Sequence, residues 1–152
     1  MATLFDATTR AALETRVRRL RPDSRPNWGR MSAHQAICHL SDGFRMGLGE
    51  RPCAPIAGRF KRLLKMVALY APLRWPRGTI KTVPEVEQGI GGTPPTEFER
   101  DRAELLALIA RFATAPPQAF PSAHPIFDRM SANDWGRWGY RHLDHHLRQF
   151  GT

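Results

Sequence analysis

The chain has 152 residues and a formal net charge of +9 at pH 7, from 23 lysines and arginines against 14 aspartates and glutamates. Its hydrophobic content of 41% and charged content of 24% are typical of a globular protein and exclude wholesale disorder. No apolar run approaches the roughly 20 residues of a membrane-spanning helix, and residues 1–20 show no secretory signal. Cys38 and Cys53 are too few for a disulfide framework and favour reduced thiols in a cytoplasm. We therefore expect one domain over residues 1–152, in a cytoplasmic protein without a membrane span.

Helical periodicity dominates the chain, and patterns typical of strands are nearly absent. The second helix is predicted to begin at a capping box formed by Ser32 and Gln35, in which each side chain binds the backbone N–H of the other residue. Similar caps are expected at Thr96–Glu99 and Ser131–Asp134. The predicted helices cover residues 8–20, 32–47, 57–70, 96–112 and 131–150. Four long helices and one shorter one predict an all-α protein, an antiparallel four-helix bundle with an additional short basic helix after the second helix.

The positive charge is concentrated in residues 45–81, which hold nine basic residues and one acid. The predicted helix within this segment carries an apolar stripe, which we expect to face inward, formed by Phe60, Leu63, Leu64 and Val67. The charge has two interpretations: a solvated helix face, or a binding surface for nucleic acid, an anionic membrane or an acidic protein. No recognised nucleic-acid motif accompanies it, which disfavours nucleic acid. Arg45 and the basic helix are also candidates to bind an anionic substrate.

Five of the six histidines lie on two predicted helices. His142 and His146 are four residues apart inside the apolar stripe of the last helix, a spacing that presents two imidazoles to one metal ion. His39 lies near the apolar stripe of the second helix, with the small residues Ala36 and Gly43 about one turn away on either side. Three imidazoles from facing helices predict one divalent metal with an open coordination position. Neutral nitrogen ligands suit zinc, nickel and iron alike.

The three histidines have a second interpretation, in which each is a separately hydrogen-bonded core residue. Asp42 and Gln149 each follow a candidate ligand by three residues and are candidates to orient an imidazole. His145, at the polar edge of the last helix, is a further neighbour that could replace the next residue as a ligand. His34 and His124 are expected at the surface or in a loop.

Two segments carry a resemblance to a known family: SAHQAICHLSD at residues 32–42 and HPIFDRMSANDWGRWGYRHLDHHLRQFG at residues 124–151. They resemble the DinB/YfiT-like superfamily and, more narrowly, a subgroup that ends in H-x-x-H-H-x-x-Q-F-G. The resemblance implies a four-helix bundle that holds one divalent metal through His39, His142 and His146. It has no counterpart for the basic segment 45–81.

Characterised members of this superfamily include thiol transferases that use bacillithiol or mycothiol, a thiol-dependent isomerase and metal-dependent hydrolase-like proteins. The resemblance therefore implies a metal-dependent thiol S-transferase or hydrolase that acts on a small molecule, with a low-molecular-weight thiol as a candidate partner. It also implies a homodimer. The alternative is a non-catalytic binding module that uses residues 45–81.

Overall fold

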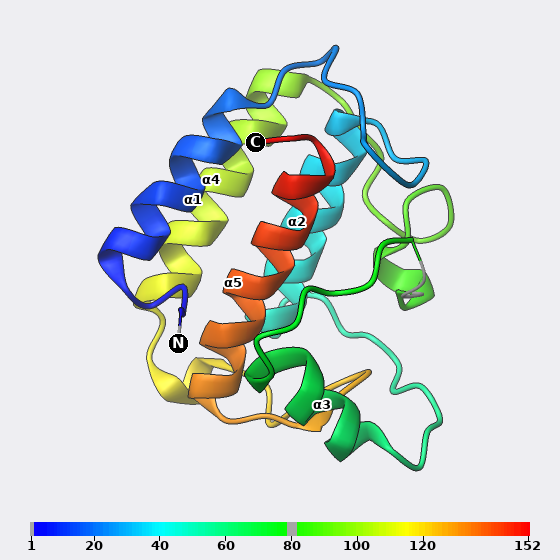
Figure 1. Ribbon diagram of the computed structural model, residues 1–152, viewed down its shortest axis with the longest axis vertical. Coiled ribbons are helices and arrows are strands. Elements are labelled where there is room, and N and C mark those ends of the chain that lie inside the picture. The colour runs from blue at the N-terminus through cyan, green and yellow to red at the C-terminus, as the bar shows by residue number, and fades with distance from the viewer. Residues whose placement is uncertain (1, 79–81) are drawn as a thin grey trace.

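The computed structural model describes residues 2–78 and 82–152 and is dominated by a four-helix bundle (Figure 1). The bundle consists of α1 (Ala7–Arg19), α2 (Ala33–Gly47), α4 (Phe98–Thr114) and α5 (Ala132–Gln149). α1 packs against α4 and α5, and α2 packs against the same two helices. α1 and α5 run in one direction and α2 and α4 in the other. The all-α bundle predicted from the sequence is confirmed.

The connection between α2 and α4 takes the chain from one end of the bundle back to the other, so both helices run in the same direction. It contains α3 (Lys61–Tyr70) and the 3₁₀ turn η1 (Pro84–Val86). A second 3₁₀ turn, η2 (Pro117–Ala119), follows α4. None of the helices among the described residues is long and apolar enough to cross a membrane.

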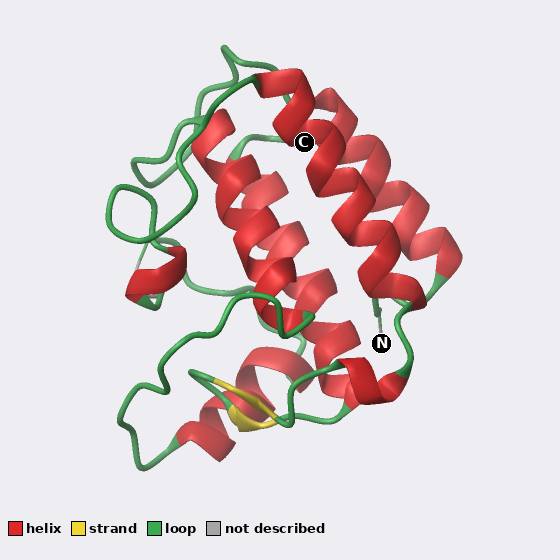
Figure 2. Ribbon diagram, turned by 180° about the vertical axis from the view of Figure 1, so that it is seen from behind, coloured by secondary structure: helices red, strands yellow, loops and turns green. Residues whose placement is uncertain are grey.

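A short antiparallel hairpin between α4 and α5 was not predicted (Figure 2). It pairs β1 (Ala123–His124) with β2 (Asp128–Arg129), and Asp128 adopts a positive φ of 61° at the turn. Strands of two residues are too short to produce a recognisable alternating pattern, so periodicity could not reveal them.

The predicted caps are correct at two helices and wrong at one. The capping boxes at the starts of α2 and α5 are present with both reciprocal hydrogen bonds. At α4 the cap is Glu97, whose carboxylate accepts the backbone N–H groups of Glu99 and Arg100. Thr96 instead donates its hydroxyl to Asp101. Glu97 caps the helix in place of Thr96 because its carboxylate accepts two N–H groups of the first turn, and its negative charge is stabilised by the positive end of the helix dipole.

One apolar core lies between the four bundle helices. Its largest fully buried side chains come from the N-terminal segment and all four helices: Leu4, Leu13, Leu20, Ile37, Leu40, Phe44, Leu105, Ile109, Phe112, Trp135, Leu143 and Leu147. Each buried leucine or phenylalanine contributes roughly 1.5–3 kcal/mol of transfer free energy. This core forms a rigid frame for the polar side chains that α2 and α5 also bury.

α3 lies beside the hairpin and α5 and buries Ala68 and Leu69 in the core. Its predicted apolar stripe does not face inward, which corrects that expectation, and lysine side chains bind α3 to the hairpin region. Lys61 donates to the carbonyl of Pro125, and Lys65 to the carbonyl of Arg129 and to Asp134. The stripe points to solvent, with exposed fractions of 65% for Phe60, 62% for Leu63, 48% for Leu64 and 45% for Val67. The helical periodicity predicts that an apolar stripe exists, but it does not predict which side of the helix faces the protein. The lysine contacts with the hairpin region determine that side.

His124 was expected at the surface or in a loop, but it is buried and lies in β1 of the hairpin. Its ring centroid lies 5.4 Å from that of Trp135 and 5.5 Å from that of Trp138, and its Nδ1 accepts the backbone N–H of Ile126. Burial, helped by the nearby positive charge of Lys61, lowers the pKa of His124 to about 3. The ring is therefore neutral in the folded protein at neutral pH.

This burial predicts a pH-dependent stability. Below about pH 6.5 the unfolded chain protonates His124 whereas the folded protein does not, so acid favours unfolding. We expect His124 to lower the free energy of unfolding by about 1.4 kcal/mol for each pH unit from 6.5 down to its folded-state pKa. Urea unfolding of the wild type and His124→Gln between about pH 7 and pH 4 measures this. As the pH is lowered, the free energy of unfolding of the wild type should decrease relative to that of the variant. If the free energies of unfolding of both proteins change equally with pH, the prediction is contradicted.

Candidate metal centre

Three buried imidazoles meet between α2 and α5. His39 comes from the middle of α2, and His142 and His146 come from successive turns of α5; their exposed fractions are 5%, 8% and 9%. The ring centroids form a nearly equilateral triangle with sides of 5.1, 4.9 and 5.0 Å, and the ring planes are inclined by 79°, 71° and 80°. One ligand nitrogen from each ring lies within 4.8 Å of the other two. These rings could hold one metal ion, and we call them the histidine triad.

Hydrogen bonds determine which nitrogen is free in two of the three rings. His39 Nδ1 lies 2.8 Å from the carbonyl oxygen of Val86, and a carbonyl only accepts, so Nδ1 carries the proton. His146 Nδ1 lies 2.9 Å from Oε1 of Gln149, and the amide nitrogen of Gln149 donates to the carbonyl of Trp28 at 2.7 Å. In both rings Nε2 is therefore left with the lone pair that a metal requires.

His142 is positioned by packing rather than by a hydrogen bond. Its Nδ1 is buried without a partner among the described residues, and its Nε2 lies 3.2 Å from Nε2 of His39. The ring stacks on Trp138 with a centroid separation of 4.8 Å and an interplanar angle of 29°. The ring also lies against Gly43, where a Cβ atom would lie only 2.8 Å from His142 Cε1. The glycine therefore makes room for the imidazole.

Burial keeps the three imidazoles neutral at neutral pH. Desolvation lowers the pKa of His39 and lowers the pKa of His142 and His146 well below the usual value. His146 and His39 also lower the pKa of His142, and His39 lowers that of His146, because a second positive charge in the triad would be repelled. A neutral imidazole is the protonation state in which histidine binds metals.

The triad fits a divalent transition metal better than it fits an internal hydrogen bond. A proton shared between His39 Nε2 and His142 Nε2 would satisfy the lone pair of His39 alone, whereas one cation satisfies all three rings. Two nitrogen ligands of a tetrahedral zinc ion with bonds of about 2.0–2.1 Å lie roughly 3.3 Å apart, and the observed separation of these two atoms is 3.2 Å. Geometry and protonation state thus both suit a metal.

Asp42 does not orient His39 through a hydrogen bond, contrary to one expectation from the sequence. Its fully buried carboxylate accepts the N–H and hydroxyl of Thr93, both at 2.7 Å, and Arg51 Nη1 at 3.0 Å. It therefore binds α2 to the connection between α2 and α4, which we call the crossover connection. The carbonyl of Val86 orients His39 instead, and a contact across 47 residues cannot be inferred from local spacing.

The other predicted neighbours have different surroundings. Gln149 binds His146, as described above. The ring of His145 lies outside the triad, 5.1 Å from that of His146, and contacts Trp28 and Trp75 with centroid separations of 5.8 Å each. His145 is thus a neighbour of the site rather than a member of the group of converging nitrogens.

Arg45 is engaged by carboxylates of the chain itself. Its guanidinium donates to Asp42 at 3.1 Å and to Glu104. An arginine that already binds two carboxylates has little capacity left for an anionic ligand. Its anion-binding role stays a prediction, and this pairing does not support it.

A second group of potential ligand atoms, which the sequence did not suggest, lies between α2 and α4: His34, Cys38 and Asp101. The carboxylate of Asp101 is satisfied by His34 Nε2 at 2.7 Å and by the N–H of Thr96 at 2.9 Å. Burial, together with the charge of Asp101, raises the pKa of Cys38 to about 12, so its sulfur remains a thiol. Internal hydrogen bonds account for this group without a metal.

A sequence model of the DinB superfamily matches residues 6–150 of the chain. The chain belongs to the DinB superfamily. The matched range includes all four bundle helices of this DinB protein and the three histidines of the triad. No curated protein and no solved structure matches the chain. The superfamily resemblance inferred from the sequence is confirmed, and the subgroup defined by the C-terminal motif stays a prediction.

The contact between Gly43 and His142 predicts the effect of one added methyl group. In Gly43→Ala the new Cβ would lie 2.8 Å from Cε1 and 3.2 Å from Nδ1 of His142, so the imidazole must shift. We expect roughly tenfold weaker zinc binding, measured by competition with a chromophoric chelator. Gly47→Ala is the matched control, because its Cβ would meet Phe112 at 2.7 Å and touch no histidine. A similar loss of zinc affinity in both variants would show that general destabilisation, rather than the position of His142, controls binding.

Proposed function

We propose that this protein is a metal-dependent enzyme in which His39, His142 and His146 hold one divalent transition metal. The observation that carries the proposal is the convergence of three buried, neutral imidazoles, two of which have Nε2 freed by a hydrogen bond at Nδ1. Three nitrogen ligands with an open fourth position are typical of catalytic rather than structural zinc sites. Nickel and iron suit the same ligands.

The proposed reaction is thiol transfer from a low-molecular-weight thiol, or hydrolysis, on a small-molecule substrate. A bound divalent cation would supply Lewis acidity, which lowers the pKa of a coordinated thiol or water. The chain's own thiols are poorly suited to act as nucleophiles, because burial raises the pKa of Cys53 and that of Cys38, the latter to about 12. A nucleophilic thiol would therefore come from solution.

The side chains around the triad would hold the ligands rigid during the reaction. Val86 and Gln149 fix the rotation of two rings through Nδ1, and Trp138 fixes the third by stacking. Since none of these contacts involves a metal ligand bond and the apolar core is continuous, we expect the fold to survive chelation. A purely structural metal would be required for folding.

Elemental analysis of protein purified without a histidine tag or chelator tests the proposal. We expect close to one divalent transition metal per chain in the wild type and its loss in His39→Ala, His142→Ala and His146→Ala, each checked for folding by circular dichroism. His34→Ala and His145→Ala should retain the metal because neither ring belongs to the triad.

Two results would contradict the assignment. A metal-free wild type that also fails to bind added zinc or nickel would eliminate the site. Loss of metal in His145→Ala, with retention in His146→Ala, would show that the ligand set is wrong.

A second, non-catalytic function is favoured by the surface of α3, and we propose that this surface binds anionic membranes. Met66 is 48% exposed and adds to the apolar stripe. Arg59 and Arg62 are also exposed, and they are next in sequence to residues of the stripe. Exposed apolar side chains beside arginines are typical of helices that lie in an anionic membrane interface. Two copies facing each other through this surface would bring like charges together, since α3 contains no acidic residue. Lys81, the last basic residue of the segment, lies outside the described residues.

Co-sedimentation with lipid vesicles tests this second function. We expect binding to vesicles that contain phosphatidylglycerol and little binding to pure phosphatidylcholine. Leu63→Glu should abolish binding, and Arg62→Gln should weaken it by about 1 kcal/mol. Ile90→Glu is the control, because Ile90 is 70% exposed but lies outside α3. Equal binding by Leu63→Glu and the wild type, or a stable dimer that Leu63→Glu dissociates, would contradict the proposal.

A homodimer and a cytoplasmic location stay predictions. The dimer was expected from the family resemblance, and the location from the low cysteine content. Both cysteines are free in the structure; Cys38 lies in α2 and Cys53 in the connection that follows it.

A further inference from the structure

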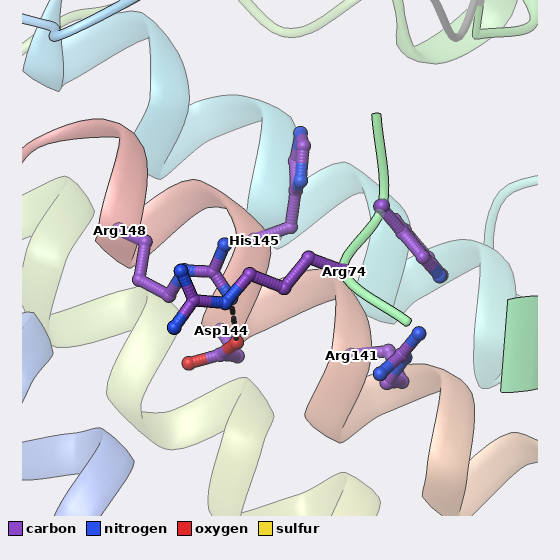
Figure 3. Close-up of a pocket in the computed structure, with 6 residues that line it drawn as sticks. Arg74, Arg141, Asp144, His145 and Arg148 are labelled. Atoms are coloured by element: carbon purple, nitrogen blue, oxygen red, sulfur yellow. Dashed lines mark hydrogen bonds and ion pairs between the residues drawn. The ribbon is translucent and has the colours of Figure 1, made fainter. Parts of the chain in front are cut away.

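A small cationic pocket lies on α5 (Figure 3). It has a volume of about 10 Å³, enough for roughly one water molecule. Its lining comes from α5 and from the segment after α3: Arg74, Trp75, Arg141, Asp144, His145 and Arg148. We call it the arginine pocket. Neither the superfamily match nor the triad accounts for it.

The arginine pocket is built by specific contacts rather than by chance proximity. Arg141 Nε donates to the carbonyl of Ala68 at 3.0 Å, and its guanidinium also binds the carbonyl of Leu73. Trp75 Nε1 donates to the same Ala68 carbonyl at 2.8 Å. These hydrogen bonds hold the end of α3 and the following residues against α5, and so they bring Arg74 over the pocket.

The positive charge of the arginine pocket is not balanced within it. Three guanidinium groups face one carboxylate, Asp144, and both oxygens of that carboxylate are already used. Oδ1 accepts Arg16 at 2.8 Å and Oδ2 accepts Arg148 at 3.2 Å. Among the described residues, Arg74 and Arg141 form no ion pair with an acid.

The arginine pocket and the triad share a wall. His145 lines the pocket, and its ring centroid is 5.1 Å from that of His146. Trp75 also lines the pocket, and its ring centroid is 6.4 Å from that of His142. The two sites are therefore neighbours, separated by the side chains of His145 and Trp75.

We propose that the arginine pocket binds a carboxylate of the substrate while the reacting end of the same molecule lies at the triad. This inference rests on the proposed metal-dependent function and defines its substrate class as small carboxylic acids. Planar guanidinium groups match the geometry of a carboxylate. Arg74 is exposed and is free to close over the bound group.

Binding of dicarboxylates to cobalt-loaded protein tests the proposal without an activity assay. One carboxylate can occupy the metal and the other the arginine pocket, so we expect the best of malonate, succinate and glutarate to bind at least about tenfold more tightly than acetate. The affinities are measured by titration of the cobalt absorption spectrum. Arg74→Gln/Arg148→Gln should lose this advantage while keeping one cobalt per chain and an unchanged affinity for acetate. Arg62→Gln, which removes an exposed arginine outside the pocket, should retain the advantage.

The outcomes separate this inference from the proposed function. If cobalt binds stoichiometrically but no dicarboxylate is favoured over acetate, or if the double variant keeps the preference, the arginine pocket does not bind substrate and the metal site stands. Tighter binding of phosphonoacetate than of any dicarboxylate would overturn the carboxylate assignment. If the wild type binds no cobalt, the proposed function fails first, and the substrate class fails with it.

Discussion

The structure depends on the need to bury three imidazoles in an apolar bundle without charging them. A buried histidine must be neutral and must find a partner for each ring nitrogen, or it destabilises the fold. The bundle helices supply the rings, but their own backbones are fully used in helical hydrogen bonds. Nδ1 of His39 therefore finds its partner outside the bundle, at the carbonyl of Val86 in the connection between α2 and α4. Nδ1 of His146 uses a side chain of its own helix, Gln149, which is itself held by the carbonyl of Trp28. The remaining lone pairs converge, and this convergence defines the site.

The crossover connection between α2 and α4 is thus more than a link. Its η1 turn orients His39, and its Thr93 and Arg51 are bound by the buried carboxylate of Asp42. Trp75, near its middle, forms part of the wall shared by the triad and the arginine pocket. Asp42 therefore supports the site indirectly, by anchoring to α2 the same connection that orients its histidine. The polar interior of this bundle and its longest connection form one structural unit.

α3 shows how a solvent-exposed apolar surface arises in a bundle whose core is already complete. Lys61 and Lys65 contact carbonyls of the hairpin region, and the apolar stripe is left without a partner in the described part of the chain. The four residues of this exposed stripe, together with Met66, are costly to leave in water, and such surfaces in monomers usually mark an interface. The flanking arginines then determine which partners are electrostatically compatible.

Much of the fold and the composition of the triad could be predicted from the sequence, because both follow from local periodicity. The 3.6-residue period places His142 and His146 on one face of α5 and His39 on the inner side of α2, and caps such as Ser32 mark the helix ends. Contacts between segments distant in the sequence leave no such signal. Only the tertiary structure decided that Val86 rather than Asp42 orients His39, that His124 is buried, that the stripe of α3 faces solvent and that Arg74 lies beside His145. The physical reason is that the 3.6-residue period determines which side chains share a helix face from the local sequence alone, whereas the segment that packs against each face depends on how the whole chain folds.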